Sequence, residues 1–170
     1  MGQKHMDINS AKALLDAVYE QLHSKPAPII ENVELEEKTD SLATWLIYLN
    51  KQATKLGLQF SLKTLAQNEL TEHVITYTIP TVAFTSQGNQ LIPLLLFKEK
   101  KGIKVRDPLS GDMPVDLNFS YLLRSNDSAC SGLPNLEKSD NVLVLIPIGI
   151  SETTNETDLT PFKRFIKLLR

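Results

Sequence analysis

The residues from Val74 to Asp107, VITYTIPTVAFTSQGNQLIPLLLFKEKKGIKVRD, decide the fold. They are rich in β-branched, aromatic and leucine residues, a composition that is typical of strands. The stretch predicts four strands, VITYTI, TVAFTS, QLIPLLLF and GIKVRD, separated by Pro80, SQGN and KEKKG and followed by DPLSG. Short turns between successive strands favour an antiparallel meander. Pro93 lies within the third strand, so we expect it at a sheet edge or a bulge, because proline has no N–H to donate.

Upstream of these strands the apolar residues follow the period of helices. Residues 8–24 and residues 40–56 each place apolar side chains three and four apart, which predicts two amphipathic helices, the second ended by Gly57. The sequence SLKTLAQ predicts a short third helix over residues 61–67. The expected N-terminal caps are Asn9 or Ser10, Thr39 or Asp40, and Ser61, respectively.

Downstream of the strands, DLNFSYLL predicts a short helix over residues 116–123, and a polar loop follows from Arg124 to Asp140. NVLVLIPIGI then predicts a final buried strand. Helices that precede a run of strands indicate an α+β fold, with the N-terminal helices packed on an antiparallel sheet. We expect one domain over residues 7–150, preceded by a cloning remnant at residues 1–6.

Composition narrows the function classes. The chain has 170 residues, of which 42% are hydrophobic, so one domain can bury a core without a disulfide or a metal. A single cysteine, Cys130, excludes a disulfide scaffold, and with only His5, His23 and His73 beside it a cysteine-rich zinc site is excluded too. The net charge of -2 disfavours nucleic acid as a partner. The longest apolar runs are about half of the ~20 residues that span a bilayer, and the low cysteine content fits the cytoplasm.

Few residues suggest catalysis. No glycine-rich phosphate loop is present, and the adjacent Glu36 and Glu37 point to different sides of any regular element. One alternative is a thiol hydrolase with Cys130 as nucleophile and His73 as base, the imidazole being held by Asp107 or Asp127. Against it, Cys130 lies in a polar loop and not at a helix N-terminus, where the thiol pKa would be lowered.

Several strings, in their order, resemble the papain-like peptidase domain at the N-terminus of bacteriocin and toxin ABC exporters. The family's Asp-Cys-Gly string at the start of a helix matches DSLATWL from Asp40 to Leu46, and its glycine matches Gly57, with SLKTLAQ in place of its short second helix. Its Leu-Pro-Ala-Ile strand, Asn-His-Phe-Val-Val strand and Asp-Pro-x-x-Gly turn match Ile79–Ala83, Asn89–Ile92 and Asp107–Gly111. The match covers roughly residues 30–147 and implies a papain-like fold.

The departures from that family concern its catalytic residues. Ser41 stands in place of the nucleophilic cysteine, Gln90 stands in place of the histidine base, and only Asp107 is retained. The family's oxyanion-hole glutamine is also missing, because Val33–Glu37 contains none. An amide takes up no proton near neutral pH, so the resemblance implies a peptidase-like domain without peptidase activity.

Such a degenerate copy resembles the C-thirty-nine-like domain of type I secretion exporters of RTX toxins and adhesins. The resemblance implies a non-catalytic cytoplasmic domain, without a cofactor or metal of its own, that docks the unfolded secreted protein; the full-length transporter would be an inner-membrane ATPase. Its substrate contacts would be Ser41, Trp45, Gln90 and Asp107. Trp45 also fits the apolar stripe of its helix, and Asp107 also fits a turn cap.

The C-terminal sequence TPFKRFIKLLR predicts a basic amphipathic helix after a linker, together spanning residues 151–170. A helix of this kind suits either the membrane surface before a first membrane span, through residues 161–170, or packing on the domain. A small stand-alone adaptor protein is a further alternative. The exporter and adaptor alternatives differ in what the natural gene encodes after Arg170.

Overall fold

A computed structural model gives the fold. The structure describes residues 6–28, 38–39, 41–100, 102–113, 119–133 and 136–149. The expected C-terminal helix and linker, the segment Val33–Glu37 and His5 lie outside these residues.

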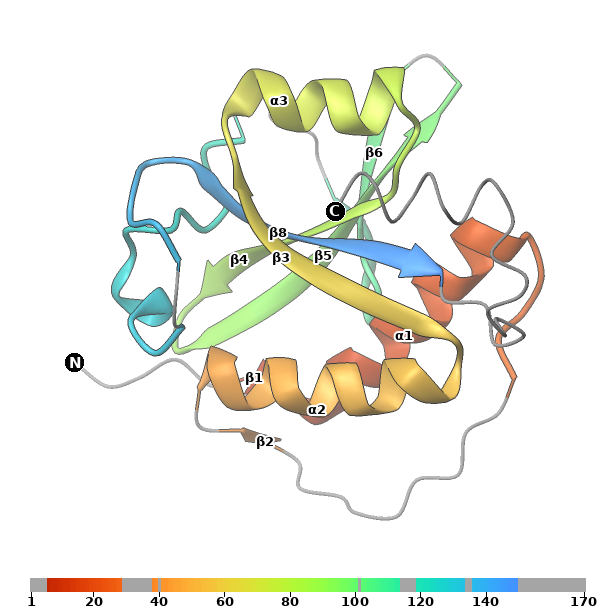
Figure 1. The fold of residues 1–170 in the computed structure, drawn as a ribbon, viewed down its shortest axis with the longest axis horizontal. Coiled ribbons are helices and arrows are strands. Elements are labelled where there is room, and N and C mark those ends of the chain that lie inside the picture. The colour runs from red at the N-terminus through yellow and green to blue at the C-terminus, as the bar shows by residue number, and fades with distance from the viewer. Residues whose placement is uncertain are drawn as a thin grey trace, which may run out of the picture.

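The described part contains three α-helices, two short helical turns, a two-stranded sheet and a six-stranded sheet (Figure 1). In chain order the elements are β1 (Met6–Asp7), α1 (Ile8–His23), β2 (Lys38–Thr39), α2 (Leu42–Lys55), β3 (Leu58–Leu65), α3 (Gln67–Thr71), the π-helical turn η1 (Glu72–Thr76), β4 (Thr81–Gln87), β5 (Gln90–Glu99), β6 (Gly102–Asp107), β7 (Gly111–Met113), the 3-10 turn η2 (Ser128–Cys130) and β8 (Val142–Gly149). The predicted α+β class is confirmed.

The large sheet has the order β3-β8-β4-β5-β6-β7, and every neighbouring pair is antiparallel. Of the predicted meander, the last three strands are present as β4, β5 and β6, and β7 is an additional strand. Gly88, with φ 61, opens the two-residue turn between β4 and β5, a conformation that favours glycine in hairpins of this length. The last strand, β8, does not continue the meander but inserts between β3 and β4.

Both faces of the sheet are covered, α1 and α2 lying on one face and α3 with η1 on the other (Figure 1). Alternate residues of each strand therefore enter two different cores. The first core cluster, under α1 and α2, includes Leu14, Leu42, Trp45, Phe84, Leu95, Cys130 and Leu145. The second core cluster, under α3 and η1, includes Leu70, Val74, Ala83, Leu94, Val105, Phe119 and Val144. Burial on both faces explains why the central strands are apolar throughout.

A short extended segment fills the space where β4 and β8 diverge. The two strands pair at Val82 and Leu145 only. Beyond that point the Leu123 N–H donates to the Phe84 carbonyl at 2.7 Å, and the Leu143 N–H donates to the Leu123 carbonyl at 3.0 Å. Leu123 thus links the two strands by backbone hydrogen bonds on both sides.

Pro93 lies in a part of β5 that is not paired with β6, as expected for a residue that has no N–H to donate to a neighbouring strand. It pairs with Phe84, whose carbonyl is turned away from β5 toward Leu123, so the pair exchanges no hydrogen bonds. The nitrogen of Pro93 therefore faces the β6 side, where pairing with β6 stops at Leu95. Proline thus removes no ladder hydrogen bond from this interior strand.

The helix caps lie close to the expected positions. Asp7 caps α1 by accepting a hydrogen bond from the Asn9 N–H at 2.9 Å, in place of the expected Asn9 or Ser10. Ser41 caps α2, one residue after the expected Asp40. Gly57 follows α2 with φ 73, in agreement with its expected role.

Two predicted elements are wrong. Residues 61–65 of SLKTLAQ belong to β3, because the apolar residues Leu58, Phe60 and Leu62 alternate with polar ones and enter the first core cluster, and Gln67 begins α3. VITYTI is not a strand: Leu70 and Val74, four residues apart, are both fully buried in the second core cluster and continue a helical turn. Tertiary packing thus overrides the β propensity of this segment.

A predicted helix and the predicted start of the domain also differ from the structure. Of the expected helix DLNFSYLL, residues 119–123 are not helical, and the remainder lies outside the described residues. Met6, assigned to the cloning remnant, is fully buried in the first core cluster and forms β1 with Asp7. None of the described helices is long and apolar enough to cross a membrane.

Candidate functional site

Ser41 serves as the N-terminal cap of α2. Its Oγ accepts a hydrogen bond from the Thr44 N–H at 3.2 Å and lies 3.1 Å from the Thr44 Oγ1. This is the ordinary use of serine at a helix start, since it satisfies one of the free N–H groups of the first turn. A hydroxyl in this role is held by the helix backbone.

Trp45 is a core residue. Its side chain is fully buried, and its Nε1 donates to the Asp7 carbonyl at 3.3 Å. The indole meets the Phe84 ring edge to face, with 5.7 Å between the ring centroids. A ligand would reach this side chain only after the core had opened.

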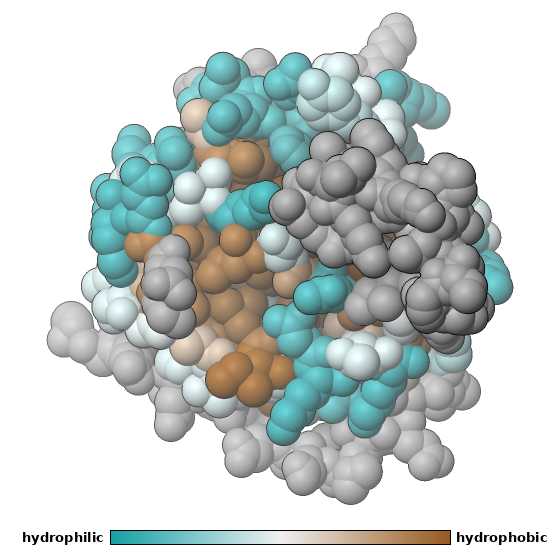
Figure 2. Space-filling model, in the orientation of Figure 1, coloured by the Kyte–Doolittle hydropathy of each residue, from teal (hydrophilic) through white to brown (hydrophobic). Residues whose placement is uncertain are grey.

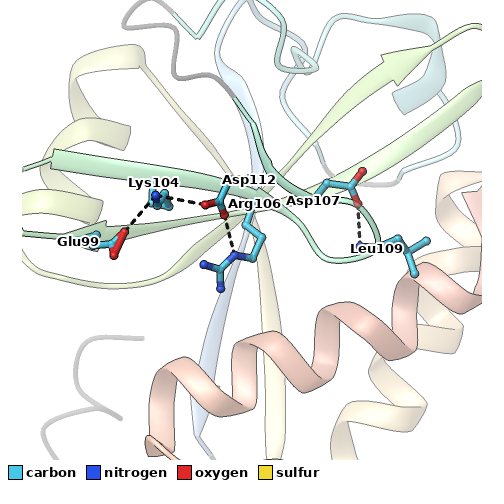
Figure 3. Close-up of polar contacts among 6 residues, drawn as sticks. All are labelled: Glu99, Lys104, Arg106, Asp107, Leu109 and Asp112. Atoms are coloured by element: carbon cyan, nitrogen blue, oxygen red, sulfur yellow. Dashed lines mark hydrogen bonds and ion pairs between the residues drawn. The ribbon is translucent and has the colours of Figure 1, made fainter.

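Asp107 organises the turn between β6 and β7 (Figure 3). Its Oδ1 accepts from the Leu109 N–H at 2.9 Å, and its Oδ2 accepts from the Ser110 hydroxyl at 2.9 Å. The residue is buried and lies on the same face of the sheet as Val105, which is a member of the second core cluster. Both carboxylate oxygens are thus engaged in the DPLSG turn.

Gln90 is exposed and lies apart from Asp107. The register pairs Leu95 with Arg106, so the position beside Asp107 on β5 is Leu94. Gln90 is four residues further along β5, about 13 Å away at the rise of a strand.

The structure does not bring Asp107 together with Ser41 and Trp45. Ser41 caps α2 and Trp45 belongs to it, and this helix covers the first core cluster, whereas Asp107 lies on the opposite face of the sheet. Asp107 and Gln90 lie in the same sheet but are not neighbours across the strands.

Replacing Asp107 by alanine is expected to lower the free energy of unfolding by about 1–3 kcal/mol, because it leaves the Leu109 N–H without its acceptor at a buried turn. Thermal unfolding measures the loss. Asp107→Asn retains one carbonyl acceptor and serves as the matched control, with a smaller decrease. An unchanged midpoint in the alanine variant would contradict a structural role for this carboxylate.

Cys130 and His73 lie on opposite faces of the sheet. Cys130 is fully buried in the first core cluster, with its Sγ 3.5 Å from the Arg124 carbonyl, whereas His73 belongs to η1, which covers the second. Asp127 caps η2 by accepting from the Ala129 N–H at 2.9 Å. The residues of the thiol hydrolase alternative are therefore not assembled.

Burial raises the pKa of the Cys130 thiol to about 11, and the negative charge of Asp127 adds to the shift while Lys138 opposes it. The neutral thiol is the form that fits this core, and the thiolate is the nucleophilic form. The buried environment of Cys130 thus lowers the nucleophilicity of its thiol.

Alkylation of Cys130 by iodoacetamide at pH 8 is expected to be about a hundredfold slower in the folded protein than in urea, because the raised pKa lowers the thiolate fraction. The same shift contributes stability that is complete below pH 9.0 and is lost as the pH rises toward about 11. Mass spectrometry of timed samples gives the rates, with His73→Ala as a control that leaves them unchanged. Rapid alkylation at pH 6 that His73→Ala abolishes would contradict this account.

A charged cluster lies on β5, β6 and β7 (Figure 3). Lys104 Nζ lies 3.4 Å from Glu99 Oε1 and 3.2 Å from Asp112 Oδ2, and Arg106 Nε lies 3.0 Å from Asp112 Oδ1. Hydrogen bonds from Arg106 and Lys104 lower the pKa of Asp112, and those to Asp112 and Glu99 raise the pKa of Lys104. The cluster is solvent-exposed and ties the short β7 to its neighbour. The sequence alone does not predict this charged cluster, because its residues come together only through the pairing of β5, β6 and β7.

The described residues contain no group of three or more His, Cys, Asp or Glu side chains placed to hold a metal ion.

One further feature is the outer edge of β3, hereafter the β3 edge. β3 is the first strand of the sheet, pairs with β8 over all eight residues, and has no strand partner on its other side among the described residues. Sequence reasoning missed this edge because it assigned part of β3 to a helix.

Comparison with known proteins gives no relative: no family model, curated protein or solved structure matches the chain.

Proposed function

We propose that this chain is a non-catalytic polypeptide-binding domain, and specifically the substrate-docking domain of a type I secretion ABC exporter. The observation that carries the binding function is the β3 edge, which has no strand partner within the part of the chain that the structure describes and belongs to a sheet covered on both faces. Such an edge binds extended polypeptide through main-chain hydrogen bonds. The exporter assignment, with the papain-like fold that it implies, rests on the order of the sequence strings.

The roles of the residues at the degenerate catalytic positions support a binding function over a hydrolytic one. Ser41 caps a helix, Asp107 holds a turn, and Gln90 offers no base. Hydrolysis needs a nucleophile within hydrogen-bond reach of a base. We therefore propose that the domain holds the secreted protein without cleaving it.

The same proposal places the domain in the cytoplasm, attached to an inner-membrane transporter that hydrolyses ATP elsewhere in its chain. Its partners would be the unfolded secreted protein, the rest of the transporter and its secretion complex, and the membrane surface through residues 161–170. Nucleic acid is not among the proposed partners, in keeping with the net charge of -2.

Sequencing the natural gene beyond the codon for Arg170 tests the exporter part of the proposal. Several apolar segments of about 20 residues, followed by a GxxxxGK[ST] phosphate loop, are expected. A stop codon soon after that position would contradict the exporter assignment.

Titrating the labelled domain with the secreted protein encoded beside that gene tests the binding part. The urea-unfolded protein, diluted into the assay, is expected to bind, and its chain is expected to stay intact by mass spectrometry. Absence of binding at both low and high salt would contradict the docking function. Cleavage of the secreted protein would contradict the non-catalytic assignment.

A further inference from the structure

Building on the proposed function, we infer that the β3 edge accepts an extended segment in which acidic and apolar residues alternate, and that this segment adds to the sheet as a strand beyond β3. The residues of this edge replace Ser41, Trp45, Gln90 and Asp107 as the expected contacts.

The direction of the β3 backbone groups follows from one hydrogen bond. The Phe60 N–H donates to Asn50 Oδ1 on α2 at 3.3 Å, so the backbone groups of Phe60 point away from β8. Backbone groups alternate in direction along a strand, and the register with β8 is continuous. The N–H and C=O groups of Leu62 and Thr64 therefore also point away from β8.

A hydrogen bond on the other side of β8 gives the same result. Leu143 pairs with Thr64, and its N–H donates to the Leu123 carbonyl, away from β3. The two residues thus form a pair that exchanges no hydrogen bonds, so Thr64 also faces outward. Two independent contacts assign outward backbone groups to this end of β3.

Asn50 limits the available length of the edge. Its side-chain oxygen already satisfies the Phe60 N–H, as a partner strand would. No described residue is shown to accept from the outward N–H groups of Leu62 and Thr64, so these are the donors for an added strand, and the Phe60 carbonyl is a further acceptor. An incoming segment would pair over the second half of β3.

Partly exposed apolar side chains lie on the face of the sheet that carries the first core cluster, to which Leu62 points. Ile47, on the side of α2 next to Asn50, is 62% exposed, and Leu62 is only partly buried. Leu136 is likewise partly buried against the first core cluster, and Figure 2 shows apolar side chains gathered between α2 and α3 on the face where β3 lies. Alternate side chains of an added strand would meet this apolar surface.

The charged residues of α2 and β3 are all lysines, and the Glu69 carboxylate lies just beyond β3, where its Oε1 accepts from the Ala66 N–H at 2.8 Å. From Leu42 to Leu65 the chain carries Lys51, Lys55 and Lys63 and no acidic residue, although the whole chain has a net charge of -2. Lys63 is exposed on β3, and Lys51 follows Ile47 by one helical turn. Acidic residues in the ligand would complement these lysines, whereas a second copy of the chain would bring like charges together.

A fluorescent peptide of about nine residues that alternates glutamate with valine is the probe. Anisotropy titration of the whole chain is expected to show binding that weakens with salt, and much weaker binding of the same peptide with lysine in place of glutamate. Thr64→Pro removes an outward N–H without removing a bond to β8, and should weaken binding at least about tenfold. Thr64→Val keeps the N–H and should bind within about twofold of the natural protein.

Lys63→Glu is a second variant that needs no backbone change. It is expected to weaken binding of the glutamate peptide and to strengthen binding of the lysine peptide. Thermal unfolding of each variant checks the fold, and Lys63→Glu carries the test if Thr64→Pro does not fold.

Equal affinity of the glutamate peptide for the natural protein, Thr64→Pro and Lys63→Glu would overturn the inference. A dimer in sedimentation that Thr64→Pro abolishes would assign the edge to a second copy and overturn it as well. If the secreted protein binds the natural chain and Thr64→Pro equally well, only this inference fails. If it binds neither, the proposed docking function fails.

Discussion

Replacing Trp45 by alanine is expected to lower the free energy of unfolding by about 3–5 kcal/mol, the usual cost of removing a fully buried tryptophan. The change also removes the hydrogen bond to the Asp7 carbonyl and the edge-to-face contact with Phe84. For a domain of this size the thermal midpoint should fall by about 6–20 °C. Thermal and urea unfolding measure both quantities.

Ile47→Ala is the matched control, because Ile47 is an apolar residue of the same helix that is 62% exposed. Its effect on the free energy of unfolding is expected to stay within about 0.5 kcal/mol. If Trp45→Ala were as stable as Ile47→Ala and instead lost polypeptide binding, Trp45 would be a binding residue and its assignment to the core would be wrong.

Leu123→Pro is expected to prevent stable folding. Proline would remove the N–H that donates to the Phe84 carbonyl, and the buried leucine side chain would be lost with it. Together these losses amount to at least about 4 kcal/mol, a large part of the stability of an ordinary domain. Circular dichroism and urea unfolding follow the outcome.

Leu123→Ala keeps the backbone hydrogen bonds and removes only the side chain. We expect it to fold, with a free energy of unfolding lower by about 2–4 kcal/mol. If both variants fold with similar stability, the link that Leu123 makes between β4 and β8 contributes nothing, and that part of the sheet is described wrongly.

The local parts of the fold could be predicted from the sequence. The meander from Thr81 to Asp107 was predictable because each turn joins strands that are neighbours in space as well as in sequence. The helix α2 was predictable because its apolar stripe has one period along its whole length. The pairing of Pro93 followed from the chemistry of proline.

The non-local parts could not be predicted in the same way. The insertion of β8 between β3 and β4 joins residues about 80 positions apart, and no local pattern specifies such a pairing. The turn η1 has the composition of a strand, and only the packing of Leu70 and Val74 on the second face makes it helical. SLKTLAQ was assigned to a helix because its alternation becomes clear only when Leu58 and Phe60 are included.

The candidate site shows the same division. The sequence correctly indicated that Asp107 could cap a turn and that Trp45 could be a core residue, since each residue has a local structural use. The β3 edge was not predictable, because a strand is an edge strand only by its place in the sheet. The lysines of α2 and β3 can be read from the sequence, but only the sheet order shows that they lie beside an edge strand.

Amide hydrogen exchange of the domain, with and without the unfolded secreted protein, tests the central claim most directly. The Leu62 and Thr64 amides are expected to exchange more slowly in the complex, because an added strand accepts hydrogen bonds from both. The Ser61 and Lys63 amides, already directed toward β8, should change little. Protection at Ser41, Gln90 and Asp107, with no change at Leu62 and Thr64, would contradict the account.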